Sequence, residues 1–401
     1  MTPARTSLTP SATDLMVLLE DAIPGAVELR HRIHADPRVS GEETDTVSLL
    51  VEHLGEQGLH RDSGALLVRI GDEGRPAVAV RAELDALPID EDTAAPWRSR
   101  NGAMHACGHD VHMAALVAVA HTLRRARADT PLVAVFQPRE ETSPSGALDI
   151  VGSGILVEQQ VQAMVGVHVQ PLLPAGVVSA LPETVNAAAD EFHITVQGTP
   201  GHGAYPHRAS DPIVAAAHVI QGLQYLVSRQ VDPMEPAVIT VGSIRGGTAP
   251  NAIPADVRLS GTLRTYTPAT RERLAEAIRS AAAAIAGTHG CSAQVDIRLG
   301  EPPLTNHPRL TAAIADELGL HGFDNSGSLR SCGADDFAHY SDQMAATMVF
   351  YGVGSGAPDD PSLHAPQFLP ADEHVGGVAR AMLASYIAAA RVIAPRASPT
   401  A

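Results

Sequence analysis

Apolar residues in the first half of the chain alternate between helical spacing and short continuous runs. Helical spacing predicts helices over 12–34, 40–58, 110–127 and 145–158. Short apolar runs predict strands over 65–71, 76–84, 131–138 and 163–169. The last two runs are apolar almost throughout, which is typical of strands buried on both faces of a sheet. This part of the chain is therefore predicted to form an α/β domain.

Local signals indicate where these elements begin, turn and end. Pro24 kinks or splits the first helix. A Ser-x-x-Glu capping box that begins at Ser40 opens the second helix, which Gly55 and Gly58 close. The sequence DEGRP between the first two strands predicts a turn, and so a β-hairpin of those strands.

The pattern changes near residue 187, where apolar and polar residues begin to alternate within the strands. This alternation predicts half-exposed strands in EFHITVQG, AVITVGSI and ADVRLSGTLRTY, accompanied by helices over 211–228 and 268–287. After about residue 302 the buried α/β pattern returns, with a helix, a strand and a helix predicted over 308–319, 345–353 and 373–394.

These patterns predict two domains, as does a length of 401 residues at roughly 100–200 residues per domain. An α/β domain with a mixed or parallel sheet is expected from 1–186 and 302–401. A smaller α+β domain, a sandwich of two layers over 187–301, is expected to be inserted into it.

Composition narrows the classes of partner and chemistry. The chain has 45 Asp and Glu against 28 Lys and Arg, a formal net charge of -17, which disfavours nucleic acid and anionic membranes as partners. No apolar run reaches the length of a membrane span without a charge or a proline. Lysine is absent, which excludes Schiff-base chemistry on a lysine. Three cysteines are too few for a disulfide framework, and the first residues lack the apolar stretch of a signal peptide, so we expect a cytoplasmic protein.

Side chains that bind transition metals stand where predicted strands end. A Cys-x-His pair lies in a glycine-containing loop before a predicted helix, and a Glu-Glu pair follows the predicted strand 131–138. One histidine lies at the end of the predicted strand 163–169, and another lies in a proline-rich loop. These residues are Cys107, His109, Glu140, Glu141, His168 and His364. Thiolate and imidazole are good ligands for Zn, Mn, Co or Ni, and active sites of α/β sheets lie at strand ends.

Each of these signals has an ordinary structural interpretation when it is taken alone: a buried inert cysteine, a solvated glutamate pair, a core histidine or a loop histidine. Together they offer more protein ligands than one tetrahedral zinc takes, and they suit two metal ions about 3.5–4 Å apart. Because Glu140 and Glu141 are adjacent in a loop, one can bind metal while the other takes a proton.

Motifs along nearly the whole chain resemble the M20 metallopeptidase superfamily, and more closely its aminoacylase and hippurate hydrolase branch. They occur in the order LRHRIHADPRVSGEE, RAELDALPI, MHACGHD, FQPREE, GVHV, GHGAYPH, DPIVAAA, PNAIP, GADDF and LHAP. The chain departs from the usual motifs at Glu83, Val111, Arg139 and Asp335, and within 142–147. No departure removes a candidate metal ligand or the glutamate that would take the proton.

The resemblance implies roles for individual residues. The five positions Cys107, His109, Glu141, His168 and His364 hold two divalent ions in such enzymes, of Mn, Zn, Ni or Co. Glu140 matches the general base, and Asp85 matches an aspartate that supports the metal site. In the inserted domain, His202 matches a histidine that reaches an active site, often across a dimer. Asn251 and Arg264 match positions that bind a carboxylate.

The resemblance also implies a reaction, the hydrolysis of an N-acyl-amino acid to a carboxylic acid and a free amino acid. The partner is then a small molecule, and the inserted domain acts as a lid and a dimerisation surface in a homodimer or higher homo-oligomer. A dipeptidase or an N-carbamoyl-amino-acid hydrolase on the same fold is the alternative, although carbamoylase-type relatives usually have His and Asp where Cys107 and His109 stand. A catalytically silent scaffold would be expected to have lost Glu140 or a ligand.

Overall fold

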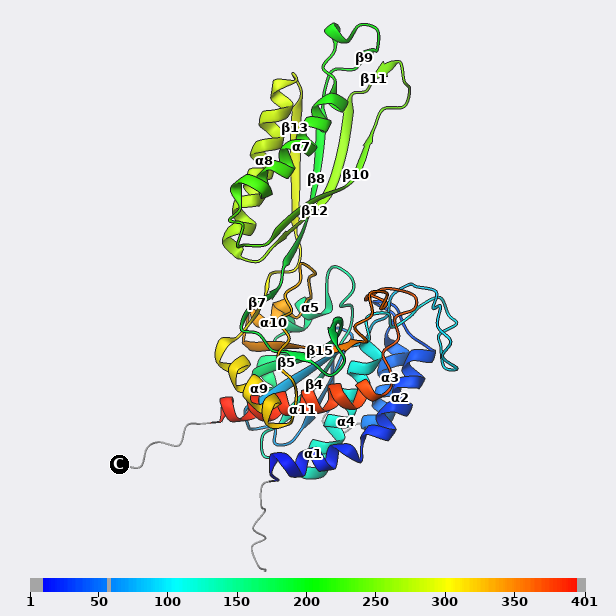
Figure 1. Cartoon of the computed structure of the whole chain (residues 1–401), viewed down its shortest axis with the longest axis vertical. Coiled ribbons are helices and arrows are strands. Elements are labelled where there is room, and N and C mark those ends of the chain that lie inside the picture. Colours follow the sequence, from blue (N-terminus) through cyan, green and yellow to red (C-terminus); the bar gives the residue numbers. More distant parts are fainter. Residues whose placement is uncertain (1–9, 56–58, 395–401) are drawn as a thin grey trace, which may run out of the picture. The chain divides into compact units, whose positions relative to one another are not determined.

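The computed structural model describes residues 10–55 and 59–394, and the chain forms two compact units (Figure 1). The first unit contains the chain up to Glu183, Thr305–Leu329 and the chain from His339 onward, and the second contains Thr184–Leu304 and Arg330–Ala338. The predicted insert lies inside the longer segment of the second unit. The short segment Arg330–Ala338, which no sequence pattern indicated, also belongs to the second unit.

A seven-stranded mixed sheet forms the centre of the first unit, which confirms the predicted α/β class. Its order is β1-β2-β4-β3-β5-β15-β6. The bounds are β1 Leu59–Asp62, β2 Ala65–Ile70, β3 Ala77–Glu83, β4 Leu132–Gln137, β5 Val161–Pro174, β6 Val178–Ser179 and β15 Ala345–Gly354. The strands β4, β3, β5 and β15 are parallel neighbours, whereas the pairs at both edges are antiparallel.

The predicted hairpin of the first two strands is wrong, because β4 lies between β2 and β3. The strand β2 instead forms a hairpin with the unpredicted β1, through a turn in which Ser63 and Gly64 have φ of 52° and 86°. The turn between β2 and β3 is held by Arg69, whose guanidinium donates to the carbonyls of Asp72 and Arg75. A short turn therefore does not specify which strands pair, since β3 bonds to β4 and β5 on its two sides.

Three of the predicted helices begin or break differently from expectation. One of them, 145–158, is divided at Gly154 into α5 (Gly146–Ser153) and α6 (Ile155–Glu158). The predicted helix 12–34 is split into α1 (Ala12–Glu20) and α2 (Ile23–Ala35), with Pro24 in the first turn of α2. The predicted capping box is wrong: α3 (Thr44–Leu54) begins after Glu43, which makes no side-chain cap. Ser40 donates its hydroxyl to Asp85 instead (Oγ–Oδ2 2.6 Å). Gly58 lies outside the described residues.

Two long buried helices contribute many residues to the core of the first unit. They are α4 (His109–Ala126) and α11 (Glu373–Ile393), which pack against each other and against β3 and β5. The helix α11 is long and apolar enough by composition to cross a membrane, but 72% of that stretch is buried in the structure, as in a core helix. Shorter helices complete the unit: α5 Gly146–Ser153, α6 Ile155–Glu158, α9 Pro308–Leu320 and α10 Ala338–Ser341.

The second unit has two layers, an antiparallel sheet of order β10-β12-β8-β13 and two helices side by side on one face (Figure 1). The strands are β8 Ala188–Gln197, β10 Ala237–Gly246, β12 Asp256–Thr265 and the unpredicted β13 Ser292–Leu299; the helices are α7 Pro212–Gln230 and α8 Pro268–Thr288. Phe192, Leu223 and Ile278 belong to the core between the layers. A small ribbon of β9 (Gly201–His202) and β11 (Ala252–Ile253) extends beyond the ends of β8 and β12. The remaining short elements are β7 Glu183–Asn186, β14 Leu304–Asn306 and the 3₁₀ turn Pro206–Arg208.

Candidate metal centre

The predicted ligands lie at the carboxyl ends of the four parallel strands of the first unit. Cys107 lies between β3 and α4, His109 is the first residue of α4, Glu141 follows β4, His168 lies in β5, and His364 follows β15. Because β4, β3, β5 and β15 are parallel neighbours, their carboxyl ends share one edge of the sheet. The topology thus brings together residues that are up to 257 positions apart in the sequence (364 minus 107).

The potential ligand atoms form overlapping groups in which all members lie within 4.8 Å of one another. Cys107, His109 and His168 form one group, and Cys107, Glu141 and His364 form another. The Cys107 Sγ is 3.5 Å from His168 Nε2, and His364 Nε2 is 3.2 Å from Glu141 Oε1. All five predicted ligands therefore belong to one cluster, in which Cys107 is common to both groups.

Hydrogen bonds orient the two buried imidazoles of the cluster. His109 donates from Nδ1 to the carbonyl of Asp85 (2.8 Å), and His168 donates from Nδ1 to the carbonyl of Val169 (2.7 Å). Both rings then present the lone pair of Nε2, the atom that a metal would bind. The His109 Nε2 is buried and has no hydrogen-bond partner among the described residues. This orphaned acceptor, beside a thiol and carboxylates, fits a divalent cation.

A neighbouring group of potential ligands is already satisfied without a cation. His112 donates from Nδ1 to Glu83 (2.8 Å) and accepts at Nε2 from the backbone N–H of Val169 (3.0 Å). Glu83 also forms a buried ion pair with Arg81. Both ring nitrogens of His112 are therefore occupied, and the Glu83 carboxylate is bonded to His112 and to Arg81. These contacts give His112 and Glu83 a structural role.

Asp85 connects two of the ligands through its carboxylate and its carbonyl. Its Oδ2 accepts from Ser40 Oγ (2.6 Å) and from the backbone N–H of Glu141 (3.0 Å), while its carbonyl accepts from His109. The fully buried Asp85 thus orients His109 and the backbone of Glu141 at once. This contact pattern supports the predicted role of Asp85.

Backbone geometry places the ligand-bearing loops close together. Gly108, between Cys107 and His109, has φ of +82°, and a Cβ there would lie 2.4 Å from Val169 Cγ2. His364 also has a positive φ, of 67°, and its N–H donates to the carbonyl of Ala106 (2.9 Å). A non-glycine residue in this region is uncommon and is found preferentially at functional sites.

Glu140 lies at the edge of the cluster, with its Oε2 3.9 Å from His109 Nε2 and its side chain 10% exposed. The preceding Arg139 points elsewhere, since its guanidinium pairs with Asp149 and its N–H donates to Glu43 Oε1 (2.9 Å). The departure at Arg139 therefore directs its guanidinium to Asp149. The His364 side chain is 49% exposed, so the cluster is open to solvent on that side.

The surrounding charges and burial act differently on the pKa values of the two buried imidazoles and of Glu141. Burial, reinforced by His112, lowers the pKa of His168 to about 3, which keeps its imidazole neutral. Burial would raise the pKa of Glu141, but the hydrogen bond from His364 and the nearby His109 outweigh it and lower that pKa. Burial would lower the pKa of His109, but Glu83, Asp85 and Glu141 outweigh it and raise that pKa. The concentration of carboxylate charge around His109 is what a bound cation would neutralise.

A buried charged network behind the cluster was not assigned any role from the sequence. Arg30 and His34 on α2 both bond to Asp110, the residue after His109 (Nε–Oδ2 2.9 Å and Nδ1–Oδ2 3.0 Å). His34 also lies 3.1 Å from Glu91. A sequence signal exists, since Arg30 and His34 are four positions apart and therefore share the helix face that also buries Leu29 and Ile33.

The second unit brings together two of its three predicted site residues. His202 lies on β9, and Asn251 precedes β11 and accepts from the N–H of Gly203 (2.8 Å). The His202 Nδ1 accepts from the N–H of Ala204 (3.0 Å), so Nε2 carries the proton and can donate it. The approach of His202 and Asn251 to the metal ligands stays a prediction.

Arg264 lies apart from these two residues, towards the other end of β12. Asp256 begins β12, next to the ribbon, and Arg264 follows it by eight positions. At a rise of about 3.3 Å per residue, Arg264 lies about 26 Å along the strand from Asp256. Asn251 and Arg264 of one chain therefore cannot hold the same carboxylate. The predicted role of each residue in carboxylate binding stays a prediction.

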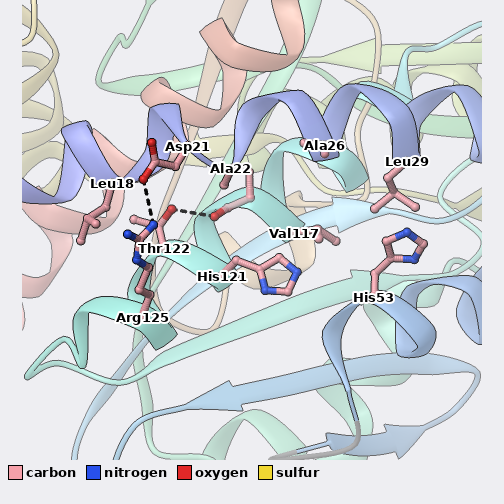
Figure 2. A pocket seen from close by; sticks show the side chains of 12 residues that line it. Leu18, Asp21, Ala22, Ala26, Leu29, His53, Val117, His121, Thr122 and Arg125 are labelled. Carbon is pink, nitrogen blue, oxygen red and sulfur yellow. Dashed lines mark hydrogen bonds and ion pairs between the residues drawn. The ribbon is translucent and has the colours of Figure 1, made fainter.

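A pocket of about 300 Å³ lies elsewhere in the first unit, between α1, α2, α3 and the second half of α4 (Figure 2). Its floor is apolar, with Leu29, Ala26 and Val117, and His53 and His121 stand at its rim. The charged groups of the rim are paired with each other, since Arg125 bonds to Asp21 (2.8 Å). None of the five predicted metal ligands lines this pocket.

Comparisons with known proteins agree over most of the chain. The family model described as peptidase family M20/M25/M40 matches residues 79–384. The chain is 32% identical over 374 residues to an N-acetyl-L-cysteine deacetylase of Bacillus subtilis strain 168, across 89% of this chain and 88% of that protein. It is 33% identical over 358 residues to an N-acetyldiaminopimelate deacetylase of Oenococcus oeni, across 86% and 92%.

A solved structure extends the similarity to three dimensions. The YXEP protein of Bacillus subtilis, described as a dinuclear metal-binding peptidase of the M20 family, superposes on this chain with a TM-score of 0.79. The two are 28% identical, and the superposition covers 92% of this chain and 99% of that one. The similarity therefore includes both units of the fold.

Proposed function

The chain belongs to peptidase family M20/M25/M40, and from this membership and its site we propose that it is a dinuclear metal-dependent amidohydrolase. Its proposed substrates are N-acyl-amino acids, which it hydrolyses to a carboxylic acid and a free amino acid. The observation that carries the proposal is the single cluster of five ligands with Glu140 at its edge.

The cluster offers separate ligands for two ions. Cys107, His109 and His168 would hold one ion, and Glu141 and His364 would hold the other; Cys107 belongs to both groups of potential ligands. When bound, divalent ions act as Lewis acids that polarise the scissile carbonyl and lower the pKa of water. The mixture of thiolate, imidazole and carboxylate is compatible with Mn, Zn, Ni or Co.

The side chains of the chain would move the protons and orient the substrate. Glu140 would take a proton from the attacking water and deliver it to the leaving amine. His202, which carries its proton on Nε2, would donate to the oxygen that becomes negative. The exposed Asn251 beside it would donate its amide to the substrate carboxylate. We propose that the second unit acts as a lid and dimerisation surface that brings these two residues to the substrate.

The names of two relatives guide the choice of substrates. Both are N-acetyl-amino-acid deacetylases by name, so N-acetyl-amino acids are the first compounds to test. Benzoyl and longer acyl groups follow, because nothing in the ligand cluster itself selects the acyl group.

The test is amine release from a panel of N-acyl-L-amino acids by the full chain, stripped with chelator and then given Mn, Co, Ni or Zn separately. We expect metal-dependent release on part of the panel. Dipeptides and N-carbamoyl-amino acids are run beside it. Turnover of only those compounds would show that the substrate is a dipeptide or an N-carbamoyl-amino acid. A chain that binds no metal and turns over no compound would contradict the proposal and favour a catalytically silent scaffold.

A further inference from the structure

The fully buried guanidinium of Arg30 bonds to two segments that flank the candidate metal centre. It donates from Nε to Asp110 Oδ2 (2.9 Å), from Nη1 to Asp372 Oδ1 (2.9 Å) and from Nη2 to the carbonyl of Pro370 (2.6 Å). Its side chain has no solvent exposure. Three acceptors from two distant parts of the chain are thus held by one rigid, planar group.

One of these segments is the beginning of α4. Asp110 immediately follows His109, so its position is tied to the position of that ligand by a single peptide unit. His34 bonds to the same Oδ2 of Asp110 (3.0 Å), whereas the Oδ1 of Asp110 accepts no hydrogen bond from any described residue. The first turn of α4 is therefore held from the side of α2 by Arg30 and His34.

The other segment is the loop that carries His364 and leads into α11. Pro370 and Asp372 follow His364 within this loop, and a second contact holds its middle, where the Asp92 N–H donates to the carbonyl of Pro366 (2.8 Å). His31 adds a contact to the same end of the loop, since its Nε2 is 2.9 Å from Asp372 Oδ2.

We propose that Arg30 is a positioning residue for the metal centre: its guanidinium fixes the His109 end of α4 relative to the loop that carries His364. The inference rests on the proposed function, because it concerns the affinity for the proposed ions. His109 and His364 belong to different groups of ligand atoms. A change in the separation of their segments therefore alters the spacing of the two sites without removing any ligand.

The chemistry of the side chain supports positioning over simple stabilisation. A buried ion pair is weak evidence for stability, since well-packed apolar residues often replace one without loss. A guanidinium has five donors in a fixed plane, whereas a lysine ammonium is a point charge on a flexible stem. Three differently placed acceptors therefore require arginine for their geometry, and lysine would retain the charge while losing that geometry.

The test compares metal affinity in three variants of the full chain after metal removal, by competition with a chelator for Mn or Zn. Arg30→Lys is expected to bind about ten-fold more weakly, the range found for partners that orient metal ligands. Asp372→Asn keeps one acceptor oxygen but removes the negative charge beside Arg30 and His31, at a side chain that is 42% exposed. It is expected to weaken binding in the same direction by less. Arg380→Lys is the matched control, because Arg380 pairs bidentately with Glu20 on α1, and it is expected to bind metal as the wild type does.

The unfolding midpoint of each metal-free variant is measured beside the affinity. A merely structural Arg30 would lower this midpoint and leave the affinity of the folded protein unchanged, and that result overturns the inference. If Arg30→Lys does not fold, Asp372→Asn decides in the same way. If the wild type takes up no metal, the proposed function is contradicted, and the inference about Arg30 fails with it. If the wild type binds metal but no more tightly than the folded variants, only the positioning role of Arg30 is contradicted.

Discussion

Glu140 and Glu141 are neighbours in the sequence, but their side chains have different surroundings. The backbone N–H of Glu141 bonds to Asp85, and its carboxylate lies 3.2 Å from His364. Glu140 has its carboxylate 3.9 Å from His109 Nε2, the atom that a metal would bind. These contacts are the reason for the roles proposed for them, Glu141 as a metal ligand and Glu140 as the group that exchanges a proton.

Glu140→Gln is expected to lower kcat by about 10²–10⁴-fold while the protein keeps its fold and its metal, because an amide cannot accept the proton. Turnover and metal content of the purified variant are measured together. Glu141→Gln is the matched control, and it is expected to lose metal as well as activity. A metal-loaded Glu140→Gln protein with wild-type turnover would show that the base lies elsewhere.

The buried His34 predicts a dependence of stability on pH. Burial alone would lower its pKa, but Asp110 and Glu91 outweigh burial and raise the pKa from 6.5 to about 9. The stability that this group contributes is therefore fully present below pH 6.5 and is lost as the pH rises through 9. A difference of this size corresponds to about 3 kcal/mol.

The free energy of unfolding is measured between pH 6 and pH 10, by denaturant titration, for the wild type and for His34→Gln. We expect the wild type to lose stability over this range and the variant to show a flatter profile. Parallel profiles would mean that His34 is not the group that titrates.

At the scale of elements, the connection between β3 and α4 is shaped by close packing around one glycine. Gly108 has φ of +82° and faces Val169 on the neighbouring strand β5. A side chain at this position would meet both a backbone penalty and a steric overlap. The connection carries Cys107 and leads into His109, two of the proposed ligands, so a change in its backbone is expected to affect metal binding.

Gly108→Ala is expected to destabilise the protein by about 2–4 kcal/mol, from the left-handed backbone and the overlap together, and to weaken metal binding. Gly322→Ala is the matched control, since Gly322 has φ of +80° with nothing near its Cβ position. The control is expected to lose only the backbone contribution of about 1–2 kcal/mol and to bind metal normally. Chemical denaturation and metal content measure both effects, and equal losses in the two variants would contradict the argument from packing.

At the scale of the whole molecule, each unit has its own apolar core, and all five proposed ligands belong to the first. The single tryptophan, Trp97, also belongs to the first unit, where it stacks on His31 at 4.3 Å between ring centroids. Its fluorescence therefore reports the unfolding of the unit that carries the metal centre.

Metal removal is expected to lower the unfolding temperature reported by Trp97. Bound metal at about 100 times its Kd contributes about 2.7 kcal/mol to the native state. Thermal unfolding of the chelated and the metal-loaded protein is followed by Trp97 fluorescence and by calorimetry, which also detects the second unit. A Trp97 midpoint that does not move on chelation would contradict a metal centre in the first unit.

The sequence by itself determined the α/β class, most strands and helices, and the residue types of the candidate metal centre. It could do so because burial on two faces, on one face or along a helical stripe leaves a local period in the chain. Pro24 also indicated a helix boundary that the structure confirms, because the effect of proline on the backbone is local. The motif order also indicated the family.

Only the tertiary structure decided the features that depend on residues far apart in the chain. The strand β4 separates β2 from β3, and Ser40 bonds to Asp85 instead of capping a helix. His112 is satisfied by its neighbours, whereas His109 keeps an unused ring nitrogen. Strand pairing and hydrogen-bond partners are chosen among all groups that the fold brings close, and no local pattern records that choice.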